Sequence, residues 1–164
     1  MPDGRWFSTT LEAELLPPLS VSLDGGSRVT ITSLLRRERR AEDQVPKTPS
    51  CWAPNKVAIE FGGIATWEEY ALVRMLEGHG WWACWVKHWY GSREFCVGPG
   101  ERTVMPEAAA AVFGAIEAAR GGASGRAWDV YAWRDGPLFI ESKQYRSTDH
   151  LNANQIAWLT PRCR

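Results

Sequence analysis

The chain has 164 residues, of which 45% are hydrophobic and 23% are charged, and its formal net charge is zero. This composition is globular rather than disordered, and no apolar run approaches the ~20 residues of a membrane helix. Phosphate neutralisation drives nonspecific nucleic-acid binding, so the neutral charge counts against a protein that simply coats DNA. The N-terminus lacks a signal-peptide pattern, and we expect a cytoplasmic protein without membrane association.

A β-hairpin is predicted near the N-terminus. Residues 20–23 and 28–32 alternate apolar and polar side chains, as strands do, and an Asp-Gly-Gly turn separates them. Residues 11–16 are interpreted as a short helix, which Pro17 and Pro18 would end because proline donates no backbone hydrogen bond.

A proline-containing linker follows this hairpin. Residues 41–54 hold three prolines and few apolar side chains, which is typical of a loop or linker. The basic run at 36–40 could contact phosphate, although a solvated loop is the commoner role of such a run. We therefore expect two regions, an N-terminal hairpin and linker at 1–55 and a folded domain at 56–164.

Strands and helices are both predicted in the second region. In chain order they are a short strand at 56–61, a helix at 66–77, an aromatic strand at 81–90 and an alanine-rich helix at 106–120. Thr66 and Glu69 have the spacing of a capping box at the start of the first helix. Pro106 suits the first turn of the second helix.

The clearest pattern is a second β-hairpin near the C-terminus. Strands are predicted at 128–133 and 138–143, joined by an Arg-Asp-Gly-Pro turn. The spacing about this turn places Asp129 opposite Glu141, so both side chains should point to the same face. Lys143, two residues further on, shares that face because side chains alternate along a strand.

These three residue types together have a recognisable chemistry. Two adjacent carboxylates repel each other and favour a hard cation such as Mg²⁺ or Mn²⁺. Such an ion activates water and polarises a phosphoryl oxygen, and a neighbouring lysine steadies the charge that develops. The pattern therefore indicates phosphodiester hydrolysis. The alternative is an exposed strand whose charges form a solvated salt bridge.

The helix after the hairpin strengthens this interpretation. It is predicted at 149–158, where its first residue, an aspartate, can act as the N-cap. Asp129 and the E-x-K triplet at 141–143 resemble the motif of the PD-(D/E)XK nuclease superfamily. The sequence LNANQIAWL at 151–159 is similar to a helix of its VRR-NUC (virus-type replication-repair nuclease) family.

The resemblance implies an α/β fold of the restriction-endonuclease-like kind, with a mixed sheet flanked by helices. It also implies a Mg²⁺-dependent (or Mn²⁺-dependent) endonuclease that acts on nucleic acid, with DNA as the expected substrate. Asp129 and Glu141 would bind the metal ion, Lys143 would assist the attack of water, and Gln155 would help to orient the site.

The chain also departs from the family pattern. It ends soon after the final helix, so the last strand of the family core is missing. The strand at 56–61 could supply it, or a partner chain could do so in a homodimer. The helix at 106–120 is inserted between the first two core strands, and the first 60 residues have no counterpart in the family pattern.

Several further residues have two possible roles each. The family often carries a metal-facing glutamate on its first helix, a role that Glu69 or Glu68 could fill, whereas the capping box is the alternative for Glu69. Lys87 and His88 could contact phosphate, although charges at a strand edge are common. Cys84 and His88 are four residues apart, and we favour a buried thiol and a polar histidine over a metal pair.

Two other functions fit the same sequence. One is a noncatalytic nucleic-acid-binding module on this fold. The other is an interaction domain that uses exposed tryptophan, since the chain has 10 Trp. Burial in the core is the commoner fate of tryptophan, and the E-x-K hairpin argues against both alternatives.

Overall fold

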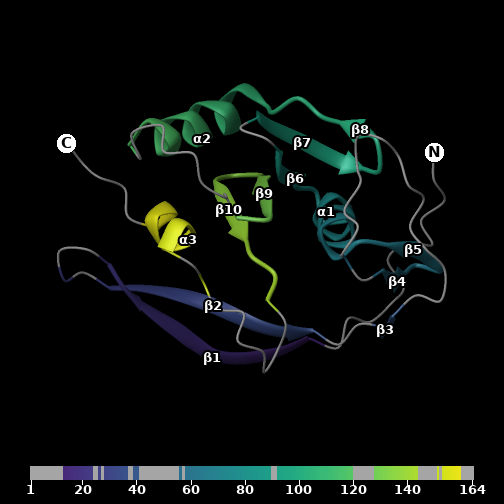
Figure 1. The fold of residues 1–164 in the computed structure, drawn as a ribbon, viewed down its shortest axis with the longest axis horizontal. Helices are drawn as coiled ribbons and strands as arrows, with labels where there is room; N and C mark the ends of the chain where they lie inside the picture. The colour runs from purple at the N-terminus through teal and green to yellow at the C-terminus, as the bar shows by residue number, and fades with distance from the viewer. Residues whose placement is uncertain are drawn as a thin grey trace.

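The computed structural model describes residues 13–23, 26, 28–36, 39–40, 56, 58–89, 92–119, 128–143, 151 and 153–159. It is a mixed α/β structure with a five-stranded sheet, a two-stranded ribbon and a small three-stranded sheet (Figure 1). Within these residues, no helix has the length and apolar character needed to cross a membrane.

The five-stranded sheet forms the centre of the molecule and has the order β10-β9-β6-β7-β8. Its strands are β6 (Trp82–Trp89), β7 (Ser92–Gly98), β8 (Glu101–Arg102), β9 (Val130–Trp133) and β10 (Pro137–Ile140). The prediction of β6 and of the β9–β10 hairpin is confirmed, whereas β7 and β8 were not predicted. Every described pair in this sheet is antiparallel, so the expectation of a mixed sheet is wrong for the described strands. Three of its four strand pairs join strands consecutive in sequence, and such connections favour antiparallel pairing.

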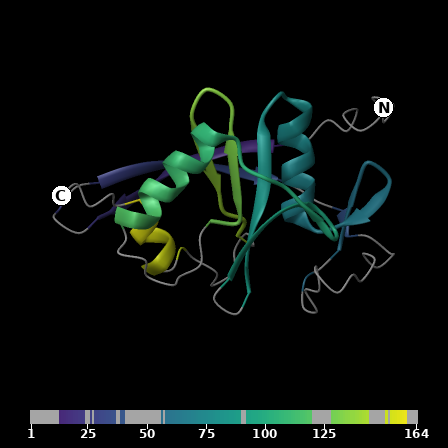
Figure 2. The same ribbon diagram turned by 90° about the horizontal axis from the view of Figure 1, so that it is seen from above.

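Two helices cover opposite faces of this sheet (Figure 2). Helix α1 (Glu68–Gly78) packs Val73 against Ala83 and Val130, while α2 (Glu107–Ala119) packs Phe113 against side chains of the other face. The alternation of side chains along β6 explains this division, since neighbouring residues point to opposite faces. The predicted helix at 106–120 is confirmed as α2. The last helix, α3 (Ala153–Trp158), adds Trp158 to the core on the α2 side.

The start of α1 differs from the prediction. Thr66 is the last residue of a strand and pairs with Ile59, so it cannot cap the helix. The N-cap residue is Trp67, which makes no side-chain capping hydrogen bond. Instead its ring is buried against Tyr70 and Trp85. The capping box predicted at this position is therefore wrong, because strand pairing and aromatic packing determine where the helix begins.

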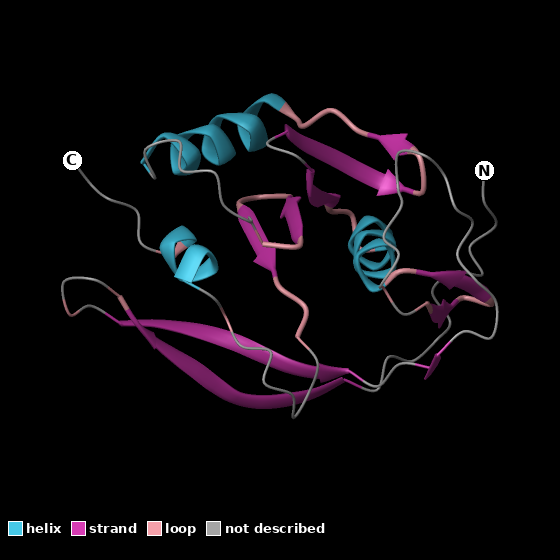
Figure 3. Cartoon of the chain, in the orientation of Figure 1, coloured by secondary structure: helices cyan, strands magenta, loops and turns pink. Residues whose placement is uncertain are grey.

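The N-terminal hairpin is confirmed as a long ribbon of β1 (Ala13–Ser22) and β2 (Arg28–Arg36), seen along the lower side of Figure 3. The helix predicted at 11–16 is wrong for residues 13–16, which pair with 33–36 instead. The register shifts between Leu16 and Leu19, where the two prolines interrupt the ladder. Ile31 of β2 packs against the core on the side of α2 and α3.

A small sheet consists of β3 (Arg39–Arg40), β4 (Ile59–Phe61) and β5 (Ile64–Thr66). The strand predicted at 56–61 is confirmed as β4, but it pairs with β3 and β5 and not with β10. The expectation that this strand completes the sheet of the hairpin is therefore wrong, because β4 lies in a separate sheet. Three predicted features lie outside the described part of the chain. They are the side chains of the basic run at 36–40, the linker at 41–54 and the aspartate at 149.

Candidate active site

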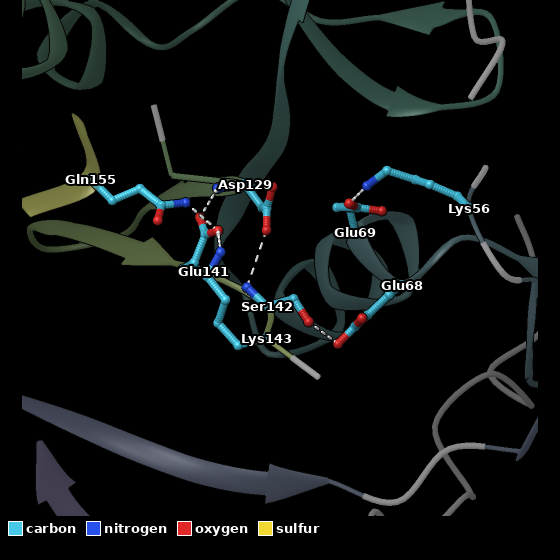
Figure 4. A network of polar contacts seen from close by, with 8 residues as sticks. All are labelled: Lys56, Glu68, Glu69, Asp129, Glu141, Ser142, Lys143 and Gln155. Carbon is cyan, nitrogen blue, oxygen red and sulfur yellow. Dashed lines mark hydrogen bonds and ion pairs between the residues drawn. The ribbon is translucent and has the colours of Figure 1, made fainter. Parts of the chain in front are cut away.

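The site begins with the register of the β9–β10 hairpin. Val130 pairs with Ile140 at the last described position of the ladder, so Asp129 and Glu141 are the next opposed residues. The backbone amide of Asp129 donates a hydrogen bond to Oε2 of Glu141 at 3.2 Å (Figure 4). The predicted juxtaposition of these two residues is therefore confirmed, because the short turn fixes the register of both strands.

A second hydrogen bond fixes the Asp129 carboxylate. Its Oδ2 accepts a hydrogen bond from the amide of Ser142 at 3.1 Å. Its Oδ1 accepts none from the residues that the structure describes. The opposite strand therefore orients the carboxylate of Asp129 through its backbone.

The Glu141 carboxylate is held by two further side chains. Nζ of Lys143 lies 2.8 Å from its Oε1, and Nε2 of Gln155 donates a hydrogen bond to the same oxygen. Gln155 is only 3% exposed, since α3 packs against the core next to it. The structure therefore brings together Asp129, Glu141, Lys143 and Gln155, as the sequence predicted.

Helix α1 directs its two first glutamates to different partners. Glu68 accepts a hydrogen bond from Oγ of Ser142, and its charge acts on Asp129. Glu69 forms an ion pair with Lys56. Sequence reasoning assigned no role to Ser142 or Lys56. Ser142 is the middle residue of the E-x-K triplet and could have been found there, whereas nothing local in the sequence marks Lys56.

Burial makes this pair of carboxylates electrostatically costly. It raises the pKa of Asp129, although the Ser142 amide and the charges of Lys56 and Lys143 partly offset the effect. Burial also raises the pKa of Glu141, and the negative charge of Asp129 raises it further. A bound cation would favour the charged forms of both groups, so the electrostatics of the site suit a positive ligand.

The donor atoms fit a hard divalent ion. Mg²⁺ prefers oxygen ligands and is commonly bound through one or two carboxylates, with water and substrate phosphates completing its shell. In the part of the chain that the structure describes, no three Asp, Glu, His or Cys side chains are grouped to hold a metal ion. Asp129 and Glu141 supply two carboxylates to such a site, and no third acid, histidine or cysteine of the described residues joins them.

Lys87, His88 and Cys84 were considered as further phosphate or metal contacts. Lys87 is buried and lies 3.7 Å from Glu94, its partner across β6 and β7, so it belongs to an ion pair within the sheet. The side chain of His88 lies outside the described residues. Cys84 is a buried free thiol, as expected, and burial raises its pKa. Lys87 therefore belongs to the sheet and Cys84 to the buried core.

Comparisons of the chain with protein-family models, with curated proteins and with solved structures found no match. The residues at the open end of the β9–β10 hairpin, and the chemistry of their side chains, therefore indicate the function of the chain.

Proposed function

We propose that the chain is a metal-dependent nuclease that hydrolyses phosphodiester bonds, with DNA as its substrate, on a restriction-endonuclease-like variant of the α/β fold. The observation that carries the proposal is the hydrogen-bonded pair Asp129 and Glu141, with Lys143 beside it. Two partly desolvated carboxylates next to an ammonium group have the polarity needed for a metal ion and a phosphate.

Each residue has a defined part in the proposed reaction. Asp129 and Glu141 would hold Mg²⁺ or Mn²⁺, and Oδ1 of Asp129 is the oxygen that no described residue occupies. The bound ion would polarise the phosphoryl oxygen and lower the pKa of water. Lys143, already directed at this centre by Glu141, would stabilise negative charge that develops on the phosphate. Gln155 would keep the Glu141 carboxylate in its orientation.

The net reaction consumes one water molecule. The water oxygen forms a bond to phosphorus, the bond from phosphorus to the leaving oxygen breaks, and the leaving oxygen takes up a proton. The ammonium group of Lys143 lies beside the Glu141 carboxylate, so it would be close enough to a phosphate bound there to stabilise its negative charge. The two acids, the lysine and an ion bound between the acids would therefore supply the groups that the proposed chemistry needs.

The two alternatives differ in their support. An interaction domain that uses tryptophan needs several exposed rings, yet all seven tryptophan side chains that the structure describes are buried or half-buried. A noncatalytic nucleic-acid-binding module would use the same fold without cleavage. Only an activity measurement separates that module from an enzyme.

The proposal extends to a homodimer. Strand β10 has β9 as its one neighbour among the described strands, which leaves an edge where a strand of a partner chain could pair. Sedimentation equilibrium of the full chain tests this part directly, because a monomeric mass at micromolar concentration would contradict it.

The direct test of the function is cleavage of labelled linear, flapped and single-stranded DNA in Mg²⁺, Mn²⁺ or EDTA. We expect metal-dependent cleavage by the wild type and its loss in Lys143→Ala. Arg134→Ala is the matched control, because Arg134 is a half-exposed cation at the opposite end of the same hairpin. Absence of cleavage on every substrate, together with absence of metal binding by calorimetry, would refute the proposal.

A further inference from the structure

A second lysine lies on the far side of Asp129 from Lys143. Figure 4 shows Asp129 between two pairs of opposite charge, Glu141 with Lys143 on one side and Glu69 with Lys56 on the other. Lys56 comes from the segment before β4 and Glu69 from the first turn of α1. The two pairs thus reach the site from distant parts of the sequence.

Two contacts fix the ammonium group of Lys56. Its partner Glu69 has a side chain only 5% exposed, and a carboxylate that is so desolvated requires a compensating charge. Nζ of Lys56 also lies 4.9 Å from the centroid of the buried Trp85 ring, within the range of a cation–π interaction. The Lys56 side chain is 36% exposed, so most of its length packs against the protein.

In Figure 4 the ammonium group of Lys56 lies on the Glu69 carboxylate, on the α1 side of Asp129. An ion at Glu69 would have to displace this ammonium group first.

We propose that Lys56 is a built-in cation of the site, which neutralises Glu69 and limits the centre to a single divalent ion held by Asp129 and Glu141. This inference rests on the proposed metal-dependent function and assigns the metal stoichiometry of that site. It also makes Glu69 a positioning residue for Lys56. Glu69 would then bind a metal ion only in a variant that lacks the charge of Lys56.

The test counts Mn²⁺ ions bound to the full chain, by calorimetry and by the electron paramagnetic resonance signal of free Mn²⁺. We expect one ion in the wild type and a second, weaker ion in Lys56→Met, which keeps an unbranched side chain, one atom shorter, but removes its charge. Lys56→Arg keeps the charge and should bind one ion. The double variant Lys56→Met with Glu69→Gln should also return to one, because the carboxylate that lost its ammonium partner is gone.

The outcomes separate this inference from the function on which it rests. A wild type that binds no Mn²⁺ overturns both. A wild type that binds two ions, or a folded Lys56→Met that still binds one with unchanged affinity, overturns the role of Lys56 alone. If Lys56→Met does not fold, Glu69→Gln decides: retention of the single ion supports the inference, and its loss makes Glu69 a ligand and refutes it.

Discussion

Asp129 and Glu141 are joined by a hydrogen bond from the amide of one to the carboxylate of the other, 3.2 Å long, at the position where the β9–β10 ladder ends. The carboxylate of Asp129 is bonded in return by the amide next to Glu141. Both acids are therefore oriented by backbone groups before any ligand arrives. Such preorganisation lowers the cost of binding an ion, because few side-chain rotations remain to be restricted.

Neutralising either acid should abolish metal-dependent cleavage. Asp129→Asn and Glu141→Gln keep the shape of the side chain but remove a charged oxygen ligand. We expect a loss larger than the ~10–100-fold that removal of an outer-shell partner usually causes. Initial rates in Mg²⁺ measure it. The control is Asp135→Asn, which removes the same charge from the hairpin turn, where the side chain is 93% exposed. A similar loss in this control would argue against a specific role for the pair.

Gln155 should affect metal affinity more than protein stability. Gln155→Met retains the buried volume but removes the amide that bonds to Oε1 of Glu141. We expect Mn²⁺ affinity to fall by ~10–100-fold, as is typical when a ligand loses the group that orients it. Calorimetric titration measures this change. Unchanged affinity with a lower melting temperature would show that Gln155 serves packing alone.

The metal-free protein should lose stability as the pH rises above the ordinary carboxyl range. Because burial raises the pKa of Asp129 and Glu141, the folded state holds their protons more tightly than the unfolded state. Their favourable contribution is complete below the unfolded pKa of about 4 and is lost as the pH rises through the folded values. Asp129→Asn should therefore be more stable than the wild type at pH 7 in EDTA.

Thermal melts at several pH values between 4 and 8 check this expectation. The stability difference between Asp129→Asn and wild type should grow with pH, and Mg²⁺ should stabilise the wild type but not the variant. A difference that is independent of pH would contradict the sign derived from the raised pKa.

Tyr131 should contribute to stability without contributing to cleavage. Its hydroxyl donates a buried hydrogen bond of 2.9 Å to the carbonyl of Ala109, which ties the site hairpin to α2. Burial raises the pKa of Tyr131 to about 12, so the hydroxyl remains a donor at neutral pH. Tyr131→Phe should lower the free energy of unfolding by about 1–2 kcal/mol in urea titrations. A lower cleavage rate of folded Tyr131→Phe would contradict the expectation that Tyr131 contributes to stability alone.

The sequence predicted the site hairpin because its signals are local. A short turn between two alternating strands fixes the register, and the register determines that Asp129 meets Glu141. Helix α2 was predicted for a similar reason, since its alanine content favours a helix wherever it packs. These elements depend on residues close together in the chain.

The errors concern residues whose partners are distant. Residues 13–16 have helix-forming side chains, but pairing with 33–36 places them in a strand. Thr66 has the spacing of a cap, yet it pairs with Ile59. Lys56 contacts Glu69 of α1 and Trp85 of β6, which lie 13 and 29 residues further along the chain. Local propensity does not encode such contacts, because tertiary packing overrides it.

The two prolines within β1 bear on how the protein behaves at high concentration. Strand β1 pairs only with β2 among the described strands, so its other edge could act as a template for a second molecule. Pro17 and Pro18 are exposed and have no backbone N–H, and because successive residues point their N–H groups to opposite edges, one of the two missing donors belongs to that outer edge. An incoming strand would find the ladder interrupted midway, and the long ribbon is thereby protected against edge-to-edge aggregation.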